Sequence, residues 1–224
     1  RLDDAGMSVQ MAEYVCHAVI RYFRELDVYA EEAQQAHWAF RRPRVRADFT
    51  VGVMGLGVLG QRVAQALRGF EFPVVGWSRT PRQVEGITCH AGAEGLSAFL
   101  GASQVLVNLL PLTPDTENIL NRDTLAQLRP GAYVINVARG AHLVDADLLA
   151  LLDSGHLAGA TLDVFRTEPL PAEHPFWQHR CITVTPHTSA RTLRDESVAQ
   201  IAGKIRALER GESITGVVDP LRGY

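Results

Sequence analysis

A glycine-rich turn between an apolar run and a helical pattern constrains the fold of this chain more than any other feature. Residues 49–54 are apolar enough for a buried strand, and the segment Gly55-Leu56-Gly57-Val58-Leu59-Gly60 follows them directly. In this order the first glycine permits a sharp turn, the second lets backbone N–H groups approach a pyrophosphate, and the third lets a helix pack closely on a sheet. The amphipathic stretch 61–68 supplies that helix. The pattern therefore predicts a dinucleotide site with the pyrophosphate at a helix N-terminus.

The end of the next expected strand indicates which dinucleotide binds. An NAD site usually carries an Asp or Glu about 20 residues beyond the glycines, where it accepts hydrogen bonds from the ribose. Here the run 73–77 ends in Ser78, Arg79 and Thr80, without a carboxylate. A guanidinium flanked by hydroxyls binds a 2′-phosphate, which a carboxylate would repel. We therefore expect NADP(H), with NAD(H) as the alternative; the same residues could also form an ordinary solvated loop.

Composition narrows the class of protein. With 224 residues the chain can form one large or two small domains, and 46% hydrophobic content with a net charge of −3 disfavours both a disordered chain and a basic nucleic-acid surface. Cys16, Cys89 and Cys181 lack the spacing of metal ligands and suit free thiols in a reducing cytosol. We expect a cytoplasmic protein with no metal and no nucleic-acid or membrane partner.

Strand and helix patterns alternate from residue 48 onward. The expected strands are 50–54, 74–77, 105–110, 133–137, 160–163 and 182–185, with a weaker one within 86–90. The expected helices between them are 57–68, 96–100, 122–128 and 145–154. Short apolar strands separated by helices predict an α/β fold, a doubly wound parallel sheet of the Rossmann type. Outside it we expect a long amphipathic helix at 7–29, a polar arm at 31–46 and a last helix at 191–210.

Polar side chains follow three of these strands at their carboxyl ends. Arg139 follows the fourth strand, Glu168 lies beyond the fifth, and His187 follows the sixth. In a parallel sheet these ends meet at one edge, where ligands bind. Reduction of a 2-keto acid needs a cation for the carboxylate and an acid for the carbonyl oxygen, which a guanidinium and an imidazole can provide. Each residue alone is an ordinary turn residue, but together they predict a hydride-transfer site in which Glu168 favours the imidazolium of His187 and fixes its ring.

Five motifs in this order resemble those of the D-2-hydroxyacid dehydrogenase family. They are Gly55-x-Gly57-x-x-Gly60, Leu110-Pro111-x-Thr113, Asn136-Val137-Ala138-Arg139-Gly140, Asp163-Val164-Phe165-x-x-Glu168-Pro169-Leu170-Pro171 and Pro186-His187. Further segments are similar to the glyoxylate/hydroxypyruvate reductase A type of this family, namely 77–80, 109–111, 152–155 and the tail 218–224. The resemblance covers essentially the whole chain.

The resemblance implies a role for each site residue. Arg139 would bind the substrate, His187 would be the acid/base, Glu168 its partner, and Asp163 would contact the nicotinamide carboxamide. The other implied cofactor contacts are Gly55, Gly57, Val58, Leu59 and Gly60 at the pyrophosphate, Ser78, Arg79 and Thr80 at the 2′-phosphate, and Leu110 and Pro111 on the adenosine side. The implied reaction is NADPH-dependent reduction of glyoxylate or hydroxypyruvate, with hydride transfer to the keto carbon and a proton from His187.

The resemblance also implies a homodimer of two-domain subunits. We expect residues 1–47 to form an interdomain helix and dimerisation arm, 48–190 the dinucleotide-binding domain, and 191–224 a crossing helix and tail that return to the substrate domain. Roughly a hundred further residues of that substrate domain are expected to precede the first helix. Trp38 would then either border the partner's pocket or pack within the arm.

The sequence is also compatible with two other functions. The chain could be a dehydrogenase for another 2-hydroxy acid, or a dinucleotide-sensing, corepressor-like binding protein of the same fold. The joint presence of Arg139, Glu168 and His187 favours an enzyme. The residues after His187, 188–190, depart from the small apolar residues common in relatives, so the pocket could differ in shape. Four histidines lack a strand-end placement and are expected at the surface: His142, His156, His174 and His179.

Overall fold

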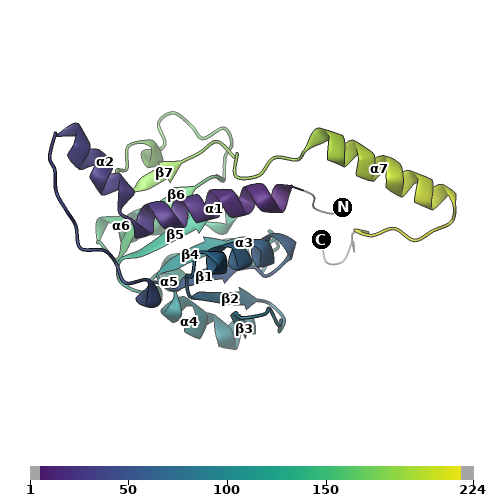
Figure 1. Cartoon of the computed structure of the whole chain (residues 1–224), viewed down its shortest axis with the longest axis horizontal. Coiled ribbons are helices and arrows are strands. Elements are labelled where there is room, and N and C mark those ends of the chain that lie inside the picture. Colours follow the sequence, from purple (N-terminus) through teal and green to yellow (C-terminus); the bar gives the residue numbers. More distant parts are fainter. Residues whose placement is uncertain (1–5, 218–224) are drawn as a thin grey trace.

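The computed structural model describes residues 6–217 and contains one seven-stranded parallel sheet (Figure 1). The strand order is β3-β2-β1-β4-β5-β6-β7, and every neighbouring pair is parallel. The strands are β1 (Val51–Met54), β2 (Val74–Ser78), β3 (Thr88–Ala91), β4 (Val105–Asn108), β5 (Ala132–Asn136), β6 (Leu157–Leu162) and β7 (Ile182–Val184). From β1 to β3 successive strands are added toward one edge of the sheet, and from β4 to β7 toward the other edge. Doubly wound sheets bind ligands where these two halves meet, which here is between β1 and β4. The predicted doubly wound, Rossmann-type fold is confirmed.

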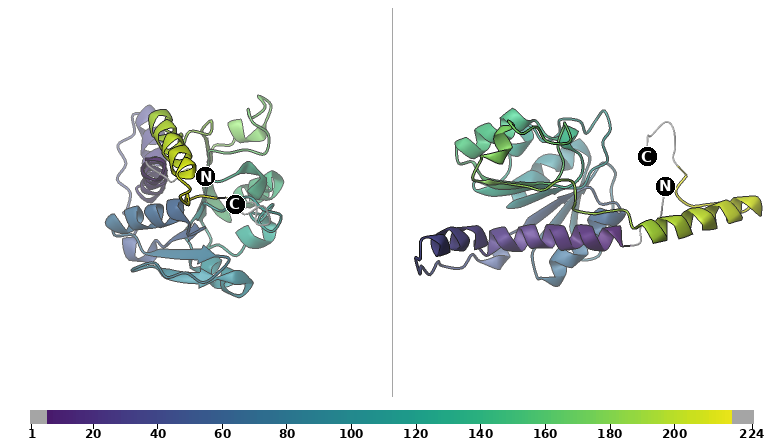
Figure 2. Two further views of the ribbon diagram at one scale, coloured as in Figure 1. Left: turned by 90° about the vertical axis from the view of Figure 1, so that its right-hand side faces the viewer. Right: turned by 90° about the horizontal axis from the view of Figure 1, so that it is seen from above.

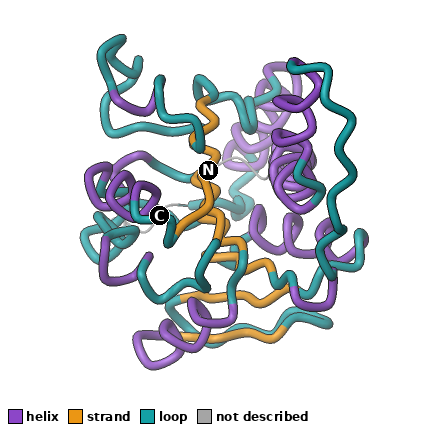
Figure 3. The backbone as a smooth tube through the Cα atoms, turned by 90° about the vertical axis from the view of Figure 1, so that its left-hand side faces the viewer, coloured by secondary structure: helices purple, strands orange, loops and turns teal. Residues whose placement is uncertain are grey.

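Helices cover both faces of the sheet, as the tube in Figure 3 shows from the side. The central strands β1, β4 and β5 are buried along their whole length, because both of their faces are covered. One face packs against α1 (Met7–Phe23) and α3 (Val58–Gly69). The other packs against α4 (Gly92–Ala102), α5 (Arg122–Leu125) and α6 (Asp145–Asp153). Three short 3-10 helices complete this part of the chain: η1 (Arg46–Asp48), η2 (Gly140–His142) and η3 (Pro175–Trp177).

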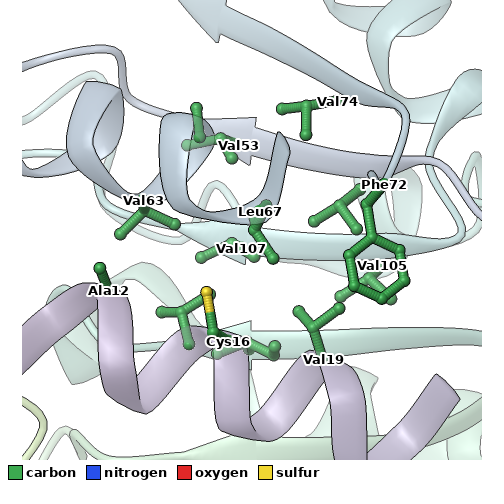
Figure 4. Packing of buried hydrophobic residues seen from close by; sticks show 14 of the residues in the cluster. Ala12, Cys16, Val19, Val53, Val63, Leu67, Phe72, Val74, Val105 and Val107 are labelled. Atoms are coloured by element: carbon green, nitrogen blue, oxygen red, sulfur yellow. The ribbon is translucent and has the colours of Figure 1, made fainter. Parts of the chain in front are cut away.

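The core beneath α1 joins this first helix to the dinucleotide fold (Figure 4). Ala12, Cys16 and Val19 of α1 face Val63 and Leu67 of α3, above valines from the sheet. Val19, Val63 and Leu67 are fully buried. Helix α1 is therefore part of the same hydrophobic core as the glycine motif's helix.

The helix expected over 7–29 is two helices, so that prediction is wrong in its length. After α1 ends, Glu25 takes a left-handed backbone conformation with φ of 54°, and α2 (Leu26–Gln34) begins beyond it. The Glu25 carboxylate pairs with Arg41 at 3.0 Å and with Arg44 at 3.7 Å. These ion pairs connect the break between α1 and α2 to the arm. The first residues of the expected arm, 31–34, belong to α2.

Other element boundaries differ modestly from the expected ones. The six expected strands lie within three residues of their predicted limits, and the weak pattern within 86–90 becomes β3. Helix α4 is longer than predicted and α5 is shorter. Trp38 is 100% exposed, so it does not pack within the arm. The family-like tail 218–224 lies outside the described residues.

The last helix, α7 (Arg194–Glu209), stands away from the layers that enclose the sheet, as Figure 1 and the right-hand view of Figure 2 show. It carries no buried residue. Within residues 6–217, no helix combines the length and apolar character needed to cross a bilayer.

Candidate active site

The glycine loop forms an open backbone cradle at the carboxyl end of β1. Gly55 has φ of +107°, and a Cβ there would meet the Leu109 carbonyl oxygen at 2.7 Å. A Cβ at Gly60 would lie 1.8 Å from the Gly55 carbonyl oxygen, so only glycine lets α3 approach this closely. A Cβ at Gly57, in contrast, would meet nothing within 4 Å. Gly57 is the residue just before α3, so the open space lies at a helix N-terminus, where unpaired N–H groups favour an anion such as a pyrophosphate.

The turn after β2 lies beside this cradle. The Gly55 N–H donates to the Trp77 carbonyl at 2.8 Å, which ties the two strand ends together. Ser78 is buried and its hydroxyl donates to the Thr80 carbonyl at 2.8 Å, while Arg79 and Thr80 are exposed. The structure thus places the predicted 2′-phosphate residues and the glycines at the carboxyl ends of two neighbouring strands, β2 and β1.

His187 and Glu168 form a hydrogen-bonded pair at the ends of β7 and β6. His187 Nδ1 lies 2.8 Å from Glu168 Oε2, and the Phe165 N–H donates to Glu168 Oε1 at 2.9 Å. Partial burial opposes ionisation of Glu168, but the hydrogen bonds from His187 and Phe165 and the charge of His187 outweigh it, so the pKa of this carboxyl lies below 4.5. Because Nδ1 faces Glu168, the ring directs Nε2 the opposite way.

The turn carrying Arg139 approaches the same segment. Arg139 is exposed, and its Nη1 donates to the Ala138 carbonyl at 2.6 Å. A Cβ on the next residue, Gly140, would lie 1.8 Å from the backbone of Phe165, so only glycine permits this contact. The structure therefore brings the turn after β5 against the segment that positions Glu168.

Comparison with known proteins decides the family. The sequence matches the model described as "D-isomer specific 2-hydroxyacid dehydrogenase, NAD binding domain" over residues 16–189. The chain belongs to this family. Glyoxylate/hydroxypyruvate reductase A of Serratia proteamaculans (strain 568) is 54% identical over 224 residues, which are 100% of this chain and 72% of that protein.

Solved structures of 2-hydroxyacid dehydrogenases share the fold closely. A D-isomer specific 2-hydroxyacid dehydrogenase from Xanthobacter autotrophicus Py2, in complex with NADPH and MES, has a TM-score of 0.96 and 44% identity over 100% of this chain and 93% of that chain. The NADPH-dependent glyoxylate/hydroxypyruvate reductase from Sinorhizobium meliloti, in complex with NADP and sulfate, has a TM-score of 0.94 and 40% identity over 100% of this chain and 72% of that chain.

Asp163 of this 2-hydroxyacid dehydrogenase braces the loop that carries His187. The Asp163 side chain is fully buried; its Oδ1 accepts from the Thr185 hydroxyl at 2.6 Å and the Thr188 N–H at 2.8 Å, and its Oδ2 accepts from the Ser189 N–H at 2.8 Å. Tyr14 of α1 lies 2.5 Å from the same Thr185 hydroxyl, and burial raises the pKa of Tyr14 to about 12. The loop holds His187 at a left-handed φ of 53°. Nothing in the sequence indicated this bracing.

His142 is completely buried, so its predicted place at the surface is wrong. It ends η2 and lies at the carboxyl edge of the sheet, 2.9 Å from Asn108 through Nδ1. Burial lowers the pKa of His142 below 6.5. The other three histidines expected at the surface are half-buried: His156, His174 and His179.

The predicted site residues lie in two neighbouring groups at the carboxyl edge of the sheet. The glycine loop and the turn at 78–80 follow β1 and β2, whereas Arg139, Glu168 and His187 follow β5, β6 and β7. Leu110 and Pro111 follow β4, which lies between the two groups.

Proposed function

We propose that this protein is an NADPH-dependent reductase of a small 2-keto acid, glyoxylate or hydroxypyruvate. The observation that carries the proposal is the His187–Glu168 pair at 2.8 Å, at the sheet edge that also carries the glycine cradle and the Arg139 turn. The names of the Serratia and Sinorhizobium relatives support this substrate class. NADP in the Sinorhizobium structure and NADPH in the Xanthobacter structure support the choice of cofactor, with NAD(H) as the alternative.

The cofactor would lie along the carboxyl edge of the sheet, across the point between β1 and β4 where the two halves of the sheet meet. Bound NADPH supplies the hydride. The N–H groups at the start of α3 would bind the pyrophosphate, and the open space at Gly57 leaves room for it. The other proposed contacts are Gly55, Val58, Leu59, Gly60, Ser78, Arg79, Thr80, Leu110, Pro111 and Asp163.

Three side chains would act on the keto acid. Arg139 would bind the carboxylate and carbonyl oxygens through its planar guanidinium. His187 would donate a proton from Nε2 to the carbonyl oxygen as the alcohol forms. Glu168 would orient the imidazole through Nδ1, because a partner on one ring nitrogen fixes what the other nitrogen faces.

The proposal extends to a second domain and a dimer. Helix α7 exposes an apolar row in which Val198, Ile201 and Ile205 are 60%, 48% and 52% exposed. Such a row supports our proposal that residues 191–224 cross back to a substrate domain, after the dinucleotide-binding domain of 48–190. We propose residues 1–47 as the interdomain helix and dimerisation arm. In that homodimer Trp38 would border the partner's pocket.

Steady-state kinetics of the full-length protein test the function. We expect turnover of glyoxylate or hydroxypyruvate with NADPH, at a higher kcat/KM than with NADH. In the His187→Gln variant we expect kcat to fall by roughly 100-fold or more, because a general acid typically contributes that much. NADPH affinity of this variant, measured by fluorescence titration, should stay close to that of the wild type. The proposal fails if the wild type reduces neither keto acid, or if His187→Gln keeps full turnover.

A further inference from the structure

Three fully buried polar side chains form a cluster at the carboxyl ends of β4 and β5. We call Asn108, Asn136 and His142 the Asn–His cluster; each is 0% exposed. The Asn108 Nδ2 donates to Asn136 Oδ1 at 3.0 Å and to His142 Nδ1 at 2.9 Å. Buried polar groups are costly unless they are bonded, so a fully bonded cluster specifies one arrangement of its neighbours.

The cluster binds the backbone of two separate loops. On the β4 side, Asn108 Oδ1 accepts from the Leu110 N–H at 3.2 Å, and His142 Nε2 lies 3.3 Å from the Pro111 carbonyl oxygen. On the β5 side, Asn136 Oδ1 accepts from the Ala138 N–H at 3.3 Å. The Asn136 Nδ2 also donates to the carbonyl of Arg139 at 3.1 Å. One loop carries proposed cofactor contacts and the other carries the proposed substrate arginine.

The hydrogen bonds require a neutral His142 with its proton on Nε2. Asn108 uses both protons of its amide nitrogen, so His142 Nδ1 must accept, and Nε2–H is left to donate to Pro111. A protonated imidazole would turn an N–H toward the Asn108 amide nitrogen. Turning over the Asn108 amide would bring its oxygen against Asn136 Oδ1 and break the bond from Leu110. The positive charge of Arg139, the charged group that acts on His142, also opposes a second cation.

We propose that His142 is a positioning residue that joins the cofactor loop after β4 to the Arg139 turn after β5. As a neutral imidazole it fixes the position of the Pro111 carbonyl through Nε2. Through Nδ1 and the two asparagines it also fixes the position of the backbone at Arg139. The inference rests on the reductase function proposed above. It assigns a role to a fully buried side chain that is not among the proposed cofactor and substrate contacts.

Two isosteric substitutions separate the two sides of the ring. In His142→Asn the amide oxygen can replace Nδ1, and in His142→Gln the amide nitrogen can replace Nε2. His142→Phe removes both bonds but fills the space. Ser103→Ala is the matched control: Ser103 is fully buried before β4, at the opposite end of that strand, and donates to the Phe99 carbonyl at 2.8 Å. Its loss removes one buried hydrogen bond away from the site.

The measurements are NADPH Kd by fluorescence titration and the KM of the keto acid, both on the full-length protein. We expect His142→Asn to weaken NADPH roughly three- to tenfold while keeping the keto-acid KM, which is the loss expected for one buried hydrogen bond. His142→Gln should raise the keto-acid KM by a similar factor and keep NADPH affinity. His142→Phe should impair both, and Ser103→Ala neither, although its melting temperature falls.

The inference is overturned if the Asn and Gln variants bind NADPH and keto acid as the wild type does. It is also overturned if both variants and Ser103→Ala lose affinity in proportion to lost stability. The variants His142→Asn and His142→Gln test the inference even if His142→Phe does not fold. Wild-type turnover is measured in parallel, so a failure of the reductase function is seen separately from a failure of the positioning role.

Discussion

At the scale of single residues, Gly57 and Gly60 serve different purposes. We expect Gly57→Ala to change the free energy of unfolding by no more than about 0.5 kcal/mol, because its Cβ meets nothing within 4 Å. The methyl group would enter the proposed pyrophosphate space, so NADPH Kd should rise at least about tenfold, which is roughly 1.4 kcal/mol. Urea denaturation and NADPH titration measure the two effects.

Gly60→Ala is the matched comparison within the same motif. Its Cβ would lie 1.8 Å from the Gly55 carbonyl oxygen, so the helix must move away from the loop. We expect a loss of about 1–3 kcal/mol in the free energy of unfolding, the usual cost of overpacking. If Gly57→Ala proves the more destabilising of the two, the assignment of the open space is wrong.

His142 also predicts how stability depends on pH. Its pKa in the folded protein lies below 6.5 because of burial, whereas in the unfolded chain it titrates near 6.5. Between these two values the unfolded state binds more protons, so the free energy of unfolding falls as pH drops through this window and is retained above it. We expect the wild type to lose stability more steeply below pH 6.5 than His142→Gln does. Denaturation curves at a series of pH values measure this, and parallel slopes would contradict it.

At the scale of elements, the sequence predicted those parts that depend on local chemistry. The glycine motif and the apolar runs place β1, α3 and the other strands, because strand burial and tight turns leave a direct pattern in the sequence. The placement of Arg139, Glu168 and His187 at one edge followed from the parallel sheet alone. Their catalytic roles remain predictions.

What the sequence did not predict depends on contacts between distant segments. Helical periodicity continues across Glu25, so the break between α1 and α2 was invisible; ion pairs to Arg41 and Arg44 accompany it. His142 follows an ordinary Arg-Gly turn in the sequence, yet η2 folds it back against Asn108. The three donors that hold Asp163 come from residues more than twenty positions away.

The packing of α3 beneath α1 gives a prediction at this scale. Leu67 of α3 is fully buried between α1 and the sheet (Figure 4). We expect Leu67→Ala to lower the free energy of unfolding by about 2–5 kcal/mol, because it leaves a cavity in the core. Leu26→Ala on α2 is the matched control, since that side chain is 47% exposed and its loss should cost no more than about 0.5 kcal/mol. Equal losses in the two variants would contradict the assignment of Leu67 to this core.

At the scale of the whole molecule, the arm after α2 is anchored at its base but presents its aromatic residues to solvent. The Arg41 N–H donates to the Tyr29 hydroxyl at 3.1 Å, and the Arg44 guanidinium lies 4.1 Å from the centre of the Tyr22 ring. Trp38 and Phe40 are nevertheless 100% and 86% exposed. Large exposed aromatic side chains on a fixed segment are typical of residues that a partner covers.

The proposed homodimer can therefore be tested at Trp38. If a second copy covers this side chain, Trp38→Ala should weaken association by about 2 kcal/mol, the value for a central aromatic contact, and so raise the dimer Kd roughly 30-fold. Trp177→Ala is the control, because Trp177 is also exposed, at 51%, but lies in η3 rather than on the arm. Sedimentation velocity over a dilution series of the full-length protein measures both. Since Arg41 and Arg44 hold the arm at its base, the substitution removes only the contact surface of Trp38. Unchanged association of Trp38→Ala would show that Trp38 does not lie in the dimer interface.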